Sequence, residues 1–264
     1  MCPRGGRLLG GEGGPLAPAK LVAHCLLIEA GDGLVLVDTG LGTGDAADPG
    51  RLGAPFRAFI RPQCNLAETA VRQIEGLGRD PRDVRHILAT HLDLDHAGGL
   101  GDFPDAEVHV FAPELAAAQA PPLRERERYV AAQWAHRPRW VPYEGGGDSW
   151  FGFDSVRLLE GLDAEIAMVP LVGHSAGHVG VAVETPEGWL LHCGDAYFHR
   201  GEMATPPSCP PGLRFFQALT QRDGAARRQN QERLRELARL HGDDVRLICS
   251  HDPHELARER STAT

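Results

Sequence analysis

The ten residues THLDLDHAGG, Thr90 to Gly99, directly follow the apolar run Val84–Ala89 and set the expectation for the whole chain. Two histidines and two aspartates lie within six of these residues. In an extended chain residues 91, 93 and 95 would lie on one side, and a turn at 95–96 can bring His96 beside them. Imidazole and carboxylate groups at this density suit Zn, Mn or Fe better than Ca or Mg alone. The stretch therefore predicts a site for one or two metal ions at the end of a buried strand.

Three further polar clusters begin where an apolar run ends. They are GHSAGH at 173–178, GD at 194–195 and SHD at 250–252. In each of them a histidine or aspartate stands where a predicted strand stops and the chain turns. Because sites built at strand ends recur across α/β folds, these clusters are further candidates for function.

The composition is that of a soluble globular protein and restricts the classes of function. The chain has 264 residues, 27 Lys and Arg against 36 Asp and Glu, a formal net charge of −9, and 13 histidines. An acidic balance argues against nucleic acid and anionic membranes as partners, because both need a basic surface. No apolar run reaches the roughly 18 residues of a membrane span, and the N-terminus lacks the hydrophobic region of a signal peptide. The six cysteines form no C-x-x-C pair. We therefore expect a cytoplasmic protein with reduced thiols that acts on a small molecule.

The strand and helix signals predict a layered α/β protein. Apolar runs at 21–29 and 34–38 flank a turn at 30–33 and predict a hairpin. Residues 66–77 and 227–240 have apolar side chains at helical spacing. Further strands are expected at 84–89, 107–111, 156–159, 166–169, 179–184, 189–193 and 245–250. This order favours sheets packed with helices outside.

The composition along the chain also predicts its division. Residues 1–19, rich in Gly and Pro, are expected as a flexible N-terminal tail, and residues 20–264 as a single domain. An aromatic-rich insertion is expected at about 120–155. Two interpretations of it stay open: a surface insertion that packs its own aromatic cluster, and a lid or pocket wall over an apolar ligand. The run RERER at 124–128 predicts a solvated helix face of mixed charge.

Taken together, the motifs resemble those of the metallo-β-lactamase superfamily. The order T-H-x-D-x-D-H-A-G-G, G-H-S-A-G-H, G-D and S-H covers roughly residues 20–255, and the early hairpin with Val37–Gly40 is similar to the N-terminal strands of that family. The resemblance is closest to the lactonase and glyoxalase II-like branches. It implies an αββα sandwich, with two mixed β-sheets, helices on the outer faces and two divalent metal ions at one edge of the sheets. It assigns His91, Asp93 and His174 to the first metal, Asp95, His96 and His251 to the second, and Asp195 to a bridge between them.

The chain departs from the family pattern H-x-H-x-D-H at Asp93, where the second histidine is usual. Zinc is the expected metal, but a more anionic first site should tolerate Mn or Fe better than a three-histidine site does. Flavodiiron proteins of the same superfamily also carry a carboxylate at this position, as Glu. We expect Asp93 to be a ligand. The alternative is an Asp93 that only contacts a ligand, which would leave the first site weak or empty.

The resemblance also implies the chemistry. Two cations lower the pKa of a shared water to about 7, and the hydroxide attacks a carbonyl that a metal polarises. Asp95 is the candidate to orient the nucleophile or pass a proton to the leaving group, and Tyr197 is the candidate to meet the substrate carbonyl. The expected function is hydrolysis of an ester, lactone or thioester of a small molecule with an apolar portion.

Other functions stay open at this point. Because Asp93 favours iron, one alternative is an iron-dependent oxidoreductase of the same superfamily. A phosphodiesterase is a further alternative. A metal-stabilised protein without catalysis is a third class. Of the remaining histidines, His178 is expected beside a ligand, His199 is a weaker candidate for the rim of the pocket, and the others are expected in structural or surface roles.

Overall fold

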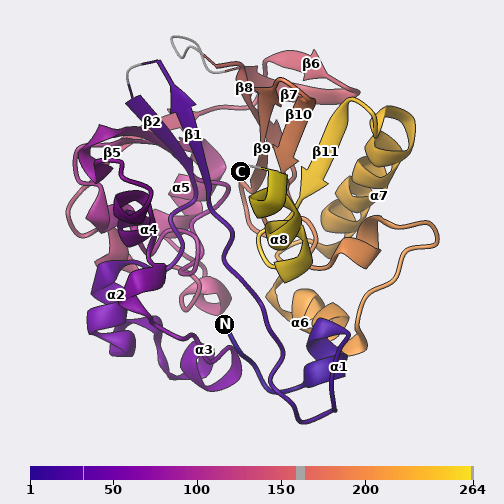
Figure 1. The fold of residues 1–264 in the computed structure, drawn as a ribbon, viewed down its shortest axis with the longest axis horizontal. Helices are drawn as coiled ribbons and strands as arrows, with labels where there is room; N and C mark the ends of the chain where they lie inside the picture. The colour runs from indigo at the N-terminus through magenta and orange to yellow at the C-terminus, as the bar shows by residue number, and fades with distance from the viewer. Residues whose placement is uncertain (32, 159–163, 263–264) are drawn as a thin grey trace.

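The protein is described by a computed structural model that covers residues 1–31, 33–158 and 164–262, and Figure 1 shows their arrangement. Two β-sheets face each other, with strand orders β1-β2-β3-β4-β5 and β11-β10-β9-β8-β7-β6. Helices flank them on both sides, α4 and α5 beside the first sheet and α7 beside the second. This is the αββα arrangement that the sequence predicts.

The first sheet is mixed. Its strands are β1 (Leu26–Ala30), β2 (Gly33–Val37), β3 (Val84–Leu88), β4 (Glu107–Phe111) and β5 (Arg139–Tyr143). The predicted hairpin is present, because β1 and β2 pair antiparallel with Ala30 opposite Gly33. All other neighbours in this sheet are parallel. The strands β2, β3 and β4 therefore end at the same edge, and Thr90–Gly99 begins there.

The second sheet is antiparallel except at one pair. Its strands are β6 (Asp148–Trp150), β7 (Phe153–Leu158), β8 (Ile166–Pro170), β9 (Val179–Thr185), β10 (Gly188–His192) and β11 (Val245–Ile248). The exception is β10 with β11, which run parallel. As a result the loop between β8 and β9 and the segments after β10 and β11 meet at one edge of the sandwich. The predicted strands near 166–169, 179–184, 189–193 and 245–250 are all confirmed.

The outer faces of the sheets are covered by α4 (Ala70–Gly76), α5 (Ala112–Gln119) and α7 (Gly224–His241). The other helices of the described residues are α1 (Gly6–Gly10), α2 (Thr43–Ala47), α3 (Ala54–Phe59), α6 (Pro211–Thr220) and α8 (Pro253–Thr262). The predicted helix at 227–240 is α7, which begins earlier because the Asp223 side chain accepts hydrogen bonds from the Ala225 and Ala226 N–H groups. The helix predicted at 66–77 is shorter. Its first residues form a 3₁₀ turn, and Thr69 is extended before α4.

Three hydrophobic clusters hold the layers together. One lies under α4 and α5 on the outer face of the first sheet, and one lies under α7, where Leu234 and Leu237 pack on the second sheet. The third lies between the sheets, where Val35, Val37 and Leu88 meet Met168 and Val181. Side chains that alternate along β2 and β3 therefore enter two different clusters, as expected for strands buried on both faces.

The first 19 residues include α1 and are joined to the rest of the chain by several contacts. The Met1 ammonium donates to the Leu21 carbonyl, the Cys2 N–H donates to the Arg61 carbonyl, and α1 lies against α6. The sequence predicts a flexible tail here. In the structure the segment instead packs across α6, while the division of the chain at residue 19 stays a prediction.

The aromatic residues at 120–155 pack into the hydrophobic clusters of the two sheets. Segment 120–155 supplies the edge strand β5, the edge strand β6 and the start of β7. Its aromatics enter all three hydrophobic clusters: Tyr129, Trp134 and Trp140 join the first, Tyr143 the one between the sheets, and Trp150, Phe151 and Phe153 the one under α7. Neither the separate surface cluster nor the aromatic lid describes this part of the chain, because the side chains are used to cover sheet edges.

Two further findings concern the whole of the described chain. Each of the six cysteines is a free thiol. Within the described residues, every helix is too short or too polar to cross a membrane.

Candidate metal centre

Four segments bring the predicted ligands to one edge of the sandwich. His91, Asp95 and His96 follow β3, and His174 lies between β8 and β9. Asp195 follows β10, and His251 follows β11. The topology explains this meeting, since β3, β8, β10 and β11 all end at this edge while their starts lie at the other.

The six residues form two groups of three. In the first group, ligand atoms of His91, His174 and Asp195 lie within 4.8 Å of one another, and all three residues are buried. In the second group the same holds for Asp95, His96 and His251. Each group has the number of protein ligands that catalytic zinc sites use, three, with a position left for water or substrate.

Asp195 lies between the histidines of the two groups. Its Oδ2 lies 3.8 Å from His91 Nε2 and 3.5 Å from His174 Nε2. Its Oδ1 lies 3.4 Å from His96 Nε2 and 3.1 Å from His251 Nε2, and its Oδ2 also lies 3.2 Å from His251 Nε2. The carboxylate is therefore within reach of the histidines of both groups, as the predicted bridging role requires.

The donor atoms fit a pair of cations better than they fit one another. His91 Nε2, His96 Nε2 and Asp195 Oδ1 are buried and have no hydrogen-bond partner, which costs about 1–3 kcal/mol for each group left in that state. The charges agree. Burial disfavours a charged His96, yet Asp195 and Asp38 raise the pKa of His96 well above its usual value. The carboxylates likewise raise the pKa of His251, so positive charge is favoured at both of these histidines, and bound cations would supply it.

The outer nitrogens of the rings are held by a set of oxygen atoms. Asp38 Oδ2 accepts from His96 Nδ1 at 2.8 Å and from the Thr90 hydroxyl at 2.7 Å. Thr90 Oγ1 in turn lies 2.9 Å from His91 Nδ1. His251 Nδ1 donates to the Val22 carbonyl at 2.7 Å. With the Nδ1 atoms used in this way, the Nε2 atoms are left to face the centre.

Asp38 is a functional residue that the sequence analysis did not assign. It directly follows β2 in a backbone conformation with φ of 53°, and its side chain accepts a hydrogen bond from the Thr90 N–H at the start of the Thr90–Gly99 loop. Burial alone would raise the pKa of Asp38, but the imidazole of His96 lowers it overall. The sequence feature that could have indicated Asp38 is its position directly after an apolar strand and before Thr39-Gly40.

His178 and Glu114 hold the bridging segment and the loops. His178 Nε2 accepts from the Asp195 N–H at 2.8 Å, and its Nδ1 donates to the Leu171 carbonyl at 3.0 Å. The prediction that His178 lies beside a ligand agrees with this position. Glu114 accepts hydrogen bonds from the N–H groups of Leu92 and Gly177 and from the Ser175 hydroxyl. The first and second polar clusters are thereby joined through α5, a connection that no local motif indicates.

Asp93 lies beside the first group and contacts a buried arginine. Its Oδ2 is 3.0 Å from His174 Nε2 and 3.5 Å from His91 Nε2. Its Oδ1 is 3.2 Å from Arg128 Nη1. Burial alone would raise the pKa of Asp93, but Arg128 and then His91 lower it well below its usual value. Asp93 is therefore a carboxylate with one oxygen toward the metal ligands and one toward a cation of the protein.

Arg128 corrects the interpretation of residues 124–128 as a solvated face. Its side chain is only 9% exposed, and it donates to the carbonyls of His174 and Thr220. Glu125 is buried as well and pairs with Arg222 at 2.8 Å. The alternating charges gave no sign of this, because the partners of Arg128 are 35 and more residues away in the chain.

Tyr197 does not reach the centre. It is fully buried under α7, and its hydroxyl donates to the Glu255 carboxyl at 3.2 Å. The predicted contact with a substrate carbonyl is therefore wrong. Its neighbour Phe198 lies on the side of the ligands instead, with its ring centroid 4.7 Å from that of His251 and 5.8 Å from that of His174. Phe216 of α6 continues this apolar wall, with its centroid 6.1 Å from that of Phe198.

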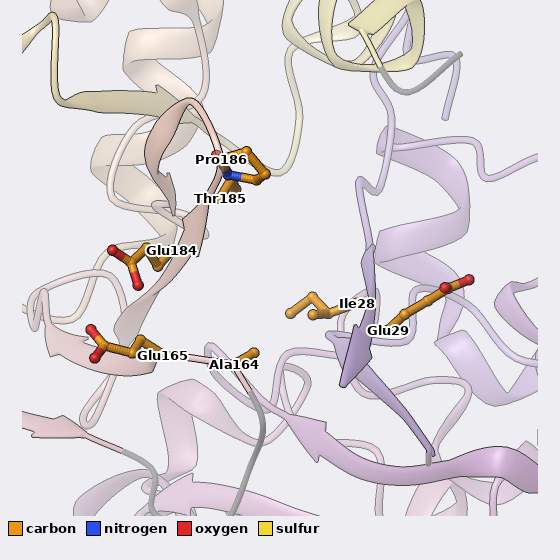
Figure 2. A pocket seen from close by; sticks show the side chains of 7 residues that line it. All are labelled: Ile28, Glu29, Ala164, Glu165, Glu184, Thr185 and Pro186. Atoms are coloured by element: carbon orange, nitrogen blue, oxygen red, sulfur yellow. The ribbon is translucent and has the colours of Figure 1, made fainter. Parts of the chain in front are cut away.

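A hollow of about 720 Å³ lies at the opposite end of the sheets. It is lined by Ile28, Glu29, Ala164, Glu165, Glu184, Thr185 and Pro186. Figure 2 shows Ile28 pointing from β1 across the gap, while the carboxylates of Glu165 and Glu184 point away from it on the far side. The site is assigned by its chemistry rather than by this hollow, because the buried histidines and aspartates lie at the other edge.

Comparisons with known proteins agree with the fold and the motifs. A family model described as the metallo-beta-lactamase superfamily matches residues 19–251. A "Probable metallo-hydrolase" of Mycobacterium tuberculosis is 47% identical over 242 residues, which is 90% of this chain and 78% of that protein. An N-acyl homoserine lactonase of Azorhizobium caulinodans is 30% identical over 234 residues, 86% of this chain and 80% of the relative.

A solved structure shares the fold. It is an N-acyl homoserine lactone hydrolase with the product N-hexanoyl-L-homoserine bound at its catalytic metal centre. The similarity has a TM-score of 0.70 at 22% identity, over 98% of this chain and 92% of that one.

Proposed function

The chain belongs to the metallo-beta-lactamase superfamily, and from this we propose that it is a binuclear metal-dependent hydrolase that opens a lactone or cleaves a related ester or thioester of a small molecule. The single observation that carries the proposal is Asp195, whose carboxylate lies within 3.8 Å of the histidines of both groups. The lactonase relatives favour a lactone within this class of substrates.

The proposed ligands are those assigned from the sequence. His91, Asp93, His174 and Asp195 would hold one ion, and Asp95, His96, His251 and Asp195 would hold the other. Two divalent ions bound there would supply a hydroxide at neutral pH and would polarise the carbonyl of the substrate. Zinc suits this nitrogen and oxygen donor set, and Mn or Fe remains compatible with it.

Asp95 is the group proposed to move the proton. It is more exposed than the buried histidines, and its two oxygens lie 4.0 Å from His96 Nε2 and 3.9 Å from His251 Nε2. The leaving alcohol or thiol of the substrate needs a proton as the bond to the carbonyl carbon breaks. A carboxyl group at the edge of the ligand set can deliver that proton or orient the attacking group.

Phe198 and Phe216 are proposed to receive the apolar portion of the substrate. Phe198 packs against the rings of His174 and His251, so an apolar group next to the reacting carbonyl would contact it. This assignment replaces the aromatic residues of 129–153, which pack in the hydrophobic clusters.

Arg128 bears on the choice between hydrolase and iron-dependent oxidoreductase. The case for iron rests on the extra negative charge of Asp93, but Arg128 lies 3.2 Å from that carboxylate and carries one compensating positive charge. The formal charge of the centre then equals that of a site with two aspartates, so the hydrolase is the function we favour.

The proposal is tested with purified protein that is freed of metal by a chelator and reloaded with zinc, manganese or iron. We expect release of acid from γ-lactones with an acyl chain in the reloaded protein, and none in the metal-free protein. A His241→Ala variant is the matched control, because His241 lies on the surface end of α7. Oxygen consumption with iron and no lactone opening by any metal form would overturn the proposal.

A second experiment tests whether Asp93 takes part in metal choice. Asp93→His restores the usual family ligand, and we expect the variant to prefer zinc over manganese more strongly than the wild type does, because an imidazole is a softer ligand than a carboxylate. Competition for the two metals, followed by elemental analysis, measures the preference. An unchanged ratio would mean that Asp93 does not touch the metal.

A further inference from the structure

A second cluster of histidine and glutamate side chains lies on the first sheet, away from the centre described above. His86 is the third residue of β3, and in the parallel pair of strands it is opposite Glu107 of β4. His109 lies two residues after Glu107, so the two side chains are on the same face of the strand. That face is turned toward the second sheet. Leu88 lies two residues after His86, and Phe111 lies two residues after His109, so both are on the same face, and both belong to the cluster between the sheets. The three side chains therefore meet at the rim of that cluster.

Their donor atoms are spaced like the ligands of one ion. His86 Nδ1 lies 3.0 Å from His109 Nε2 and 3.7 Å from a carboxylate oxygen of Glu107. One ligand atom from each residue lies within 4.8 Å of the other two. A tetrahedral zinc ion with bonds near 2.0–2.1 Å separates its ligand atoms by about 3.3 Å. The separations of His86 Nδ1 from the other two ligand atoms, 3.0 and 3.7 Å, lie on either side of this value.

The ring of His109 is oriented so that its Nε2 faces His86. Its Nδ1 lies 2.7 Å from the Tyr143 hydroxyl oxygen, and the two rings are stacked at 13°. When that nitrogen donates to the tyrosine oxygen, Nε2 keeps its lone pair for a cation. Burial, and then the neighbouring His86, lower the pKa of His109 to about 4, so the ring is neutral at pH 7.

The cluster is also accessible from solvent. The side chain of His86 is 27% exposed and that of Glu107 is 42% exposed, whereas His109 and Tyr143 lie deeper. An ion can therefore enter, and water can complete its coordination. His91 lies beyond the other end of β3, so this position is separate from the binuclear centre.

We propose that His86, Glu107 and His109 bind a third divalent transition-metal ion, which joins β3 to β4 at the end of the sheet remote from the binuclear centre. Two imidazoles and one carboxylate suit zinc, cobalt, nickel or iron, and zinc is the probe chosen for the test. The ion would fix the β3–β4 register and has no role in the reaction.

The test is X-ray diffraction from crystals of the zinc-loaded full chain, with anomalous data collected on both sides of the zinc absorption edge. We expect a peak of anomalous density between His86 and Glu107, in addition to density at the binuclear centre. In His86→Asn and in Glu107→Gln this peak disappears while the density at Asp195 stays. The peak is retained in His241→Ala, the matched control for a surface histidine.

A second readout covers the case of a variant that folds poorly. Zinc binding to the folded chain raises the melting temperature, so we expect a larger rise for wild type than for Glu107→Gln, which has nearly the same shape. Lactone opening should be equal in the two proteins. No peak at His86 in the loaded wild type, or a peak that persists in His86→Asn, would overturn the proposal and leave a hydrogen-bonded histidine pair. Because the binuclear centre is measured by its own density, failure here does not affect the proposed hydrolase.

Discussion

The two halves of the metal centre are built from similar ligands but are supported in different ways. The half with His91 and His174 has an extra carboxylate, Asp93, and a buried guanidinium from Arg128. In the half with His96 and His251 the guanidinium, that of Arg200, pairs with Asp252 beside His251 and not with a residue of the Thr90–Gly99 motif. The segments of this half rest on Glu255, a buried carboxyl that accepts from the Cys249 N–H and the Tyr197 hydroxyl. Asp38 contributes to both halves through Thr90 and His96.

This difference explains how the chain tolerates Asp93 at a position where the family pattern has a histidine. An uncompensated carboxylate next to buried ligands is costly, because a buried charge needs a partner. Arg128 supplies that partner from a segment 35 residues along the chain. We infer that the first half depends on an ion pair, whereas the second depends on a carboxyl that is easily protonated.

The largest effect is expected where the halves meet. Asp195→Asn keeps the size of the side chain but removes the charge shared by both groups. We expect activity to fall by more than about 10³-fold, since losing even an outer partner of a ligand costs 10–100-fold. Metal should be lost from both halves. Kinetics and metal content are the measurements, with Asp244→Asn as an exposed control.

If Asp195→Asn loses metal from only one half, the two groups are independent sites and Asp195 is not a bridge.

The next effect should be confined to the first half. Arg128→Met leaves Asp93 buried without its cation, which costs about 3–5 kcal/mol of stability. It should also weaken metal binding at His91 and His174 by about 10–100-fold, with the second half unaffected. The double variant Asp93→Asn, Arg128→Met should recover much of the lost stability, because it removes both charges. Denaturant unfolding and metal titration measure these changes.

A double variant no more stable than Arg128→Met would contradict the ion-pair account. So would an equal loss of metal from both halves.

The second half should respond to pH through Glu255. Burial raises the pKa of this carboxyl from 4.5 to about 7. Because the unfolded chain ionises first, the group lowers stability progressively as pH rises from about 4.5 to 7, and the loss is then constant. At 1.36 kcal/mol per pKa unit the loss is about 3 kcal/mol. Glu255→Gln cannot ionise, so its stability relative to wild type should increase over this range.

Denaturant unfolding of the metal-free proteins at several pH values tests this, with Glu184→Gln as an exposed control. A difference between Glu255→Gln and wild type that does not change with pH would show that Glu255 is ionised throughout.

The smallest effect is expected at the apolar wall. Phe216→Ala removes a ring that packs on Phe198, so we expect KM for a long-chain acyl lactone to rise by about tenfold, which corresponds to 1–2 kcal/mol of lost apolar contact. KM for a short-chain lactone should change little. Leu219→Ala is the matched control, because Leu219 lies on the same helix and is largely exposed. Equal changes for both substrates would place the acyl chain elsewhere.

The strands and the polar clusters at their ends could be predicted from local patterns, and the αββα fold and the ligand set followed from the resemblance that those clusters carry. His91, Asp95 and His96 occur in one short motif, and His174, Asp195 and His251 each follow an apolar strand.

The supporting residues could not be predicted, because their partners are distant in the sequence. Arg128 is part of an alternating charged run, and only the packing of that run on the His174 loop buries it. Tyr197 shows the opposite case. Its spacing from Asp195 suggested a role in the site, but the chain turns so that Phe198 faces the ligands and Tyr197 faces the core. His86 and His109 have no motif at all and meet only through strand register.

The central claim is that Asp195 joins two groups of ligands into one binuclear centre, and the most direct measurement is the anomalous diffraction of crystals of the metal-loaded chain. The account predicts two peaks about 3.5–4 Å apart, one on each side of the Asp195 carboxylate, with Oδ2 toward the ion at His91 and His174 and Oδ1 toward the ion at His96 and His251. A single peak, or two peaks of which neither contacts Asp195, would contradict it.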